Sequence, residues 1–130
     1  MRINQNFSFM KQFKDKILDG TKTITNRTAT EFRGKINAGD IMHCFTGMRT
    51  ANCEKWCDSL VIERAKWEYE DVVPVYTSIA KNTRSPFIQF TWYDFAMLDG
   101  FMRWYDFVDY FLSHKNRELG FYAYKFEVIK

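Results

Sequence analysis

The segment Ile17–Arg27, which reads ILDGTKTITNR, changes its pattern at Gly20. Before this glycine the apolar residues recur at helical spacing and the charged residues fall on the opposite face, which predicts an amphipathic helix ending at Gly20. After it, Thr21–Arg27 is rich in β-branched residues and predicts a strand or an extended entry into one. A helix that leads directly into a strand favours a mixed fold class. The apolar residues of the helical pattern are Phe9, Met10, Phe13, Ile17 and Leu18.

The rest of the chain alternates between the two patterns without any internal repeat. Apolar or alternating runs predict strands, and apolar stripes at helical spacing predict two short helices late in the chain. The order is typical of an α+β domain whose strands curl into a small mixed β-barrel, with short helices covering its open ends. We expect one domain over residues 1–130. The predicted strands are 41–46, 60–69 and 122–128, with further apolar or extended stretches at 71–82 and 87–90, and the predicted helices are 91–99 and 103–114.

Composition limits the classes of function. The chain has 13 Phe, 7 Tyr and 4 Trp in 130 residues, and such bulky side chains fill small barrels and also stack on nucleobases. A net charge of +3 is compatible with a phosphate-bearing partner, but it is too small for a protein that coats nucleic acid. The sequence shows no signal-like start and no run of 18 apolar residues, so we expect a soluble cytoplasmic protein without a membrane partner.

The cysteines predict neither a disulfide framework nor a metal site. Cys44, Cys53 and Cys57 are odd in number, and the last two are not at the spacing of the common zinc knuckles. His43 precedes Cys44 on a predicted strand, where neighbouring side chains point to opposite faces and could not both bind one ion. We therefore expect free thiols, no metal and no cofactor.

The segment after Gly20 concentrates reactive groups. Lys22, Thr23, Thr25 and Arg27 place an amine, hydroxyls and a guanidinium within six residues. This set could bind a phosphate or a polarised carbonyl, or it could form a nucleophile from a threonine and a lysine base. Residues three apart in a regular strand face opposite sides, so a Lys22–Thr25 pair requires Lys22 to lie in the turn before the strand begins.

Several motifs together resemble the ASCH domain family. They are the G-x-K-T-x-T-x-R pattern of residues 20–27, the Gly39-Asp40 turn before a strand, Asp99-Gly100-Phe101 before a helix, and an aromatic closing strand. ASCH domains are small PUA-like β-barrels. The resemblance therefore implies one PUA-like domain over nearly the whole chain.

Within this family the chain is most similar to small amidohydrolases that remove the acyl group from N4-acetylcytidine. The resemblance implies Lys22 as the base, Thr25 as the nucleophile and Asp99 as the assisting acid, although the hydrolases have a glutamate at the last position. Arg27 and Thr23 are then candidate substrate-binding residues. Trp92 and Tyr93, just ahead of Asp99, are candidates for stacking on the base.

Three other functions remain open from the sequence. The domain could read RNA or modified nucleic acid without catalysis, with Lys22 and Arg27 holding phosphates. It could be a ribonuclease, although its two histidines, His43 and His114, lie outside the motif. It could also bind a protein partner through the loop at residues 47–57. A nucleoside or RNA is the partner we expect.

Overall fold

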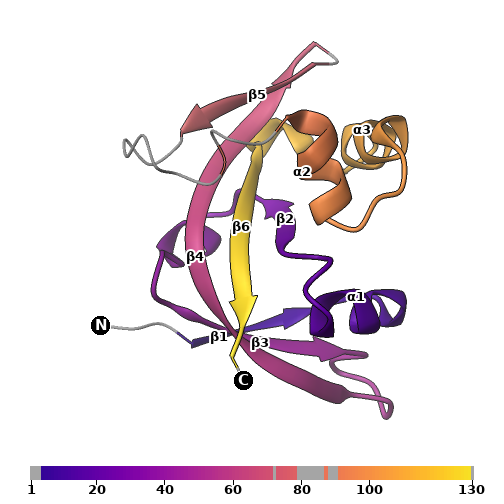
Figure 1. The fold of residues 1–130 in the computed structure, drawn as a ribbon. Coiled ribbons are helices and arrows are strands. Elements are labelled where there is room, and N and C mark those ends of the chain that lie inside the picture. The colour runs from indigo at the N-terminus through magenta and orange to yellow at the C-terminus, as the bar shows by residue number, and fades with distance from the viewer. Residues whose placement is uncertain (1–3, 72, 79–86, 88–90, 130) are drawn as a thin grey trace.

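The computed structural model describes residues 4–71, 73–78, 87 and 91–129, and within them the chain forms a strand-rich α+β domain (Figure 1). Its strands are β1 (Asn4–Ser8), β2 (Ile24–Thr28), β3 (Ile41–Thr46), β4 (Glu54–Glu70), β5 (Val73–Ser78) and β6 (Phe121–Val128). Its α-helices are α1 (Lys14–Leu18), α2 (Trp92–Leu98) and α3 (Trp104–Leu112). Short 3-10 turns lie at η1 (Lys11–Phe13), η2 (Arg33–Lys35) and η4 (Arg117–Leu119).

The strands form one curled mixed sheet in the order β1-β3-β4-β6-β2, with β5 pairing with one end of β4. The β1–β3 pair is parallel and the other pairs are antiparallel. The predicted α+β class with a curled sheet and flanking short helices is confirmed. The sheet is a half-barrel, since β1 and β2 form its two edges and do not pair with each other.

Two apolar cores lie against the sheet, and β4 and β6 contribute to both. One core surrounds the fully buried Trp67 of β4, whose ring contacts side chains of α2, α3 and β6. The second core lies at the α1 end of the sheet (Figure 1). Most of the abundant aromatic residues serve these cores, including Phe7, Phe9, Phe87, Phe95, Phe107, Phe121, Tyr124 and Phe126.

The observed elements agree with the predicted ones to differing extents. The predicted strand at residues 41–46 has the bounds of β3, whereas β4 extends well beyond the predicted 60–69 on its N-terminal side. The predicted first helix is partly the 3-10 turn η1, and β1 was not predicted. Of the stretch 71–82, residues 73–78 form β5, while 72 and 79–82 lie outside the described residues, as do 88–90. Among the described helices, none has the length and apolarity to cross a membrane.

Candidate functional site

Lys22 occupies the turn between α1 and β2. Helix α1 ends at its C-cap Asp19, and Gly20 follows with a φ of 84°, a left-handed conformation that glycine adopts without strain. The Lys22 N–H donates to the Lys16 carbonyl at 2.9 Å, and the Thr23 N–H donates to the Leu98 carbonyl of α2 at 2.9 Å. Regular strand geometry begins only at Ile24. Lys22 therefore lies in the turn before the strand, as a Lys22–Thr25 pair requires.

Helix α2 presents Asp99 to this turn. It starts with a capping box, in which Thr91 and Asp94 bond each other's backbone N–H groups, and it ends with Asp99 at the C-cap. Gly100 follows with a φ of 98°, and a Cβ there would lie 2.8 Å from the Phe13 ring. Glycine at this position is required both by the backbone conformation and by the close approach of η1.

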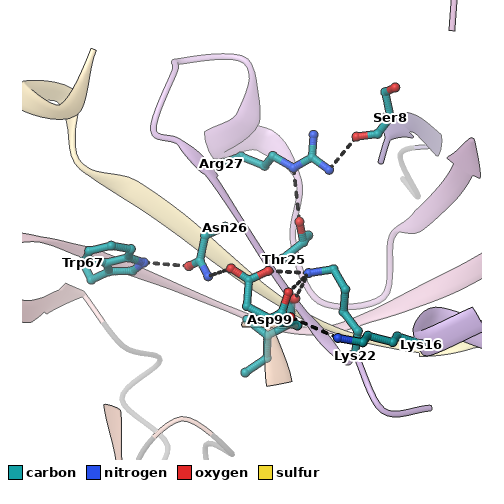
Figure 2. Close-up of polar contacts among 10 residues, drawn as sticks. Ser8, Lys16, Lys22, Thr25, Asn26, Arg27, Trp67 and Asp99 are labelled. Carbon is teal, nitrogen blue, oxygen red and sulfur yellow. Dashed lines mark hydrogen bonds and ion pairs between the residues drawn. The ribbon is translucent and has the colours of Figure 1, made fainter. Parts of the chain in front are cut away.

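Lys22 and Asp99 form a buried ion pair (Figure 2). Their exposed fractions are only 2% and 5%. The Lys22 Nζ donates to Asp99 Oδ1, to the Asp99 carbonyl at 2.5 Å and to the Ile24 carbonyl at 2.8 Å. An ammonium has three protons to donate, so all of them are engaged by the protein.

A chain of hydrogen bonds fixes the carboxylate of Asp99. Its second oxygen accepts from Asn26 Nδ2 at 2.9 Å, and Asn26 Oδ1 accepts from Trp67 Nε1 at 2.7 Å (Figure 2). The buried indole of the first core thus determines which way the Asn26 amide points, and the amide orients the carboxylate. Neither Asn26 nor Trp67 was singled out from the sequence.

Burial pushes both members of the pair toward their neutral forms. Desolvation lowers the pKa of Lys22, although its contacts with Asp99 oppose the shift and the nearby charge of Arg27 adds to it. Desolvation likewise raises the pKa of Asp99, against the contacts with Lys22 and Asn26. The proton between these groups is therefore held less firmly by the amine than it would be in water.

Thr25 and Arg27 lie on β2 beside this pair. The Thr25 side chain is 3% exposed, and its Oγ1 accepts from Arg27 Nε at 3.2 Å. Arg27 Nη2 donates to the Ser8 carbonyl at 2.9 Å and so connects the two edge strands of the sheet (Figure 2). The guanidinium also lies over the rings of Phe7 and Phe9, at 5.1 and 4.9 Å from their centres.

Lys22, Thr25, Arg27 and Asp99 line one cavity of about 250 Å³. This is slightly below the usual range for small-molecule sites, which is about 300–1,000 Å³. No hydrogen bond joins Lys22 Nζ to the Thr25 hydroxyl, because the described partners of Nζ are all carbonyl or carboxylate oxygens. The cavity also has an aromatic wall, which includes Phe9, Phe13, Phe101, Tyr110 and Phe111.

The other predicted site residues lie elsewhere. Thr23 borders a second cavity of about 620 Å³ on the other side of Lys22, and its buried hydroxyl has no partner among the described residues. Trp92 packs in the first core, with its ring 4.4 Å from that of Tyr76, and Tyr93 is 56% exposed. Neither lines the cavity that contains Lys22, so the aromatic wall there comes from residues that the sequence did not indicate as candidates for stacking.

The two histidines differ in their surroundings, and the three cysteines differ in burial. His114 lines the cavity, whereas His43 lies on β3 and contacts Asp58 at 2.6 Å. The three cysteines are free thiols, with Cys44 buried and Cys53 exposed. Within the described part of the chain, no group of three or more His, Cys, Asp and Glu side chains is arranged to hold a metal ion.

Comparisons with known proteins identify the fold. No protein-family profile matches the sequence, and no curated protein matches it either. Among solved structures, the chain is similar to hypothetical protein PH0355, with a TM-score of 0.61 and 14% identity over 98% of this chain and 100% of that one. It is also similar to protein EF3133 of Enterococcus faecalis V583, of the family DUF984, with a TM-score of 0.56 and 12% identity over 99% and 81% of the two chains. At these identities the likeness shows a shared small, barrel-like fold.

Proposed function

We propose that this chain is an ASCH-type, PUA-like domain that hydrolyses an acylated exocyclic amine of a nucleobase, with N4-acetylcytidine as the representative substrate. The observation that supports the proposal most directly is the buried Lys22–Asp99 pair, which shares one cavity wall with the Thr25 hydroxyl. Buried pairs with opposed pKa shifts recur where enzymes hold a transferable proton. The free thiols fit a reducing compartment, and we place the activity in the cytoplasm.

In the first chemical step, Thr25 Oγ1 attacks the acyl carbon and its proton passes to the neutral amine of Lys22. The amine becomes available when Asp99 holds the proton of the pair, which burial of both groups favours. Lys22 Nζ exchanges one of its carbonyl acceptors for the Thr25 hydroxyl as substrate enters. Catalytic hydrogen bonds are often longer in the free enzyme than in its complexes.

In the second step, the tetrahedral intermediate collapses and the bond between the acyl carbon and N4 breaks. The Lys22 ammonium returns its proton to the leaving nitrogen, which gives cytidine and an acyl ester on Thr25. Water then attacks the ester, with Lys22 again accepting and returning the proton, and the carboxylic acid is released. Arg27 Nε, which donates to Thr25 Oγ1, stabilises the partial negative charge on that oxygen while its proton passes to Lys22 and again when the ester bond breaks.

The remaining walls of the cavity suit the rest of the substrate. The rings of Phe9, Phe13, Phe101 and Tyr110 offer faces and edges for a planar base, and stacking of this kind contributes about 1–3 kcal/mol per base. Asn26 and Trp67 act through Asp99, since the Asn26 amide donates to the carboxylate and Trp67 Nε1 donates to that amide. We class them as positioning residues.

Hydrolysis of N4-acetylcytidine by the purified chain tests the proposal, with released cytidine measured by chromatography. We expect Lys22→Met and Thr25→Val each to lower kcat by about 10²–10⁴, whereas Thr25→Ser keeps a measurable part of the rate. Two matched controls remove the same groups outside the cavity, namely Lys125→Met and Thr21→Val, and both should keep the full rate. Turnover by Thr25→Val at the wild-type rate would refute the nucleophile.

A non-catalytic nucleoside-binding module is the second candidate, and one observation favours it. All three Lys22 ammonium protons are engaged, and none of them points to the Thr25 hydroxyl. In that case the wild-type chain binds N4-acetylcytidine without releasing cytidine, and Thr25→Val binds it with similar affinity. Calorimetric titration beside the turnover assay separates the two candidates.

A further inference from the structure

Two arginines stand together where the half-barrel is open. Arg27 belongs to the edge strand β2, and Arg33 of η2 folds back onto the end of the same strand. Both line the cavity that contains Lys22, and both also line an adjoining cavity of about 230 Å³. The opposite wall of the adjoining cavity includes β1 residues 5–7. The two guanidinium groups therefore border both cavities.

In each guanidinium group, some nitrogens donate hydrogen bonds to the protein and others have no partner among the described residues. Arg33 Nη1 donates to the Thr28 carbonyl at 3.0 Å and to Thr28 Oγ1 at 2.6 Å, which uses both of its protons. The Nε and Nη2 of Arg33 have no partner among the described residues, and together they form the edge that binds phosphate in bidentate fashion. Arg27 uses Nε and Nη2, and its Nη1 has no described partner.

Neither of these two charges has a direct ion-pair partner among the described residues, although the charge of Asp99 acts on Arg27 and opposes the lowering of its pKa. Within the described residues no ion pair involves either arginine, whereas Arg103 is paired with Asp106 on the surface. Burial lowers the pKa of Arg27 to about 10, and the charge of Arg33 contributes in the same direction. Two like charges near each other, with no direct ion-pair partner, carry a cost in free energy that an anionic ligand would lower.

We propose that Arg27 and Arg33 form a phosphate subsite, so that the preferred ligand of the cavity is a cytidine mononucleotide rather than the free nucleoside. This inference rests on the proposed function for the base and adds the phosphate to it. Arg33 is the specificity residue, because its free Nε–Nη2 edge is the fork that a phosphate fits. The two cavities have room for one nucleotide, and the net charge of +3 does not provide a long track for an RNA backbone.

Calorimetric titration with cytidine 5′-monophosphate, cytidine 3′-monophosphate and cytidine tests the subsite without requiring turnover. We expect one of the monophosphates to bind about 10- to 100-fold more tightly than cytidine, which is the range for hydrogen bonds between charged groups. Arg33→Gln should remove this difference in affinity between the monophosphate and cytidine. Arg33→Lys, which keeps the charge but not the fork, should keep part of it. The matched control is Lys35→Gln, an exposed cation two residues away, which should change nothing.

The outcomes separate this inference from the proposed function. Equal affinity for the nucleoside and both monophosphates, or no binding of any of them by the folded chain, would overturn the subsite. If the nucleoside and both monophosphates bind with equal affinity, release of cytidine from N4-acetylcytidine would still be evidence for the hydrolase. A 12-nucleotide cytidine-containing RNA serves as a competitor. If this RNA binds much more tightly than the monophosphate, and its affinity falls with salt as several phosphate contacts require, then the preferred ligand is RNA and the mononucleotide assignment is overturned. Loss of preference in Lys35→Gln would also contradict the assignment.

Discussion

Replacement of Asp99 by asparagine should destabilise the protein far more than an isosteric change usually does. The two carboxylate oxygens of Asp99 accept from different donors, Lys22 Nζ and Asn26 Nδ2. An asparagine offers one oxygen and one NH₂ group, so in either orientation its NH₂ faces a donor. The substitution therefore leaves either the lysine or the amide without its acceptor in a site that is almost fully buried.

The magnitude follows from burial. Removing one partner of a buried ion pair costs about 3–5 kcal/mol, because the remaining charge is left uncompensated. A loss of this size lowers the urea midpoint by more than about 1 M for a domain of this length. Lys22→Met combined with Asp99→Asn should recover part of the loss, since the asparagine oxygen can then face Asn26 and no buried ammonium is left without its carboxylate.

Equilibrium unfolding in urea, followed by tryptophan fluorescence, measures both variants. Asp106→Asn, which breaks the exposed pair with Arg103, is the matched control and should leave the midpoint unchanged. The reasoning fails if Asp99→Asn unfolds at the wild-type midpoint. It also fails if the double variant shows the full sum of the two single losses, because that result would mean that Lys22 and Asp99 do not interact.

Two further predictions concern the support of the site and the thiols. Gly100→Ala should lower the free energy of unfolding by about 1–3 kcal/mol, because alanine disfavours the positive φ and its methyl group would meet the Phe13 ring. Thermal melting measures this change, and an unchanged melting midpoint would contradict the prediction. In the folded chain a thiol reagent at pH 8 should modify Cys53 rapidly and leave Cys44 unmodified, since burial raises the pKa of Cys44 to about 12. Equal rates for the two thiols in native buffer, or no gain in reactive thiols on unfolding, would disagree with that placement.

The sequence predicted the parts of the site that depend on local pattern. Gly20 ends the helix, so the turn position of Lys22 followed from the glycine and from the β-branched run after it. The meeting of Lys22 with Asp99, 77 residues later, was expected only through the family resemblance, and the structure brings the two together. Long-range contacts of this kind depend on how strands pair, which a single sequence does not encode in any short window.

Three other features could not be predicted from local sequence pattern, each for a physical reason. The strand β1, with the sequence NQNFS, has one buried residue and no clear alternation, and its parallel pairing with β3 is what makes it a strand. The register of β4 shifts between Val61 and Glu63, which breaks the period of two and hides the N-terminal part of the strand. Asn26 looks like an ordinary polar strand residue, because its partner Trp67 is 41 residues away.

The open edge of the half-barrel gives the cavity an unusual mechanical property. One wall belongs to β2 and the other to the end of β1, and three intervening strands separate them in the sheet. The width of the cavity therefore depends on the curvature of the whole sheet. A small change of twist at each strand adds up across the sheet and would change the distance between β1 and β2. The Arg27–Ser8 hydrogen bond joins these two described edge strands and opposes such a change.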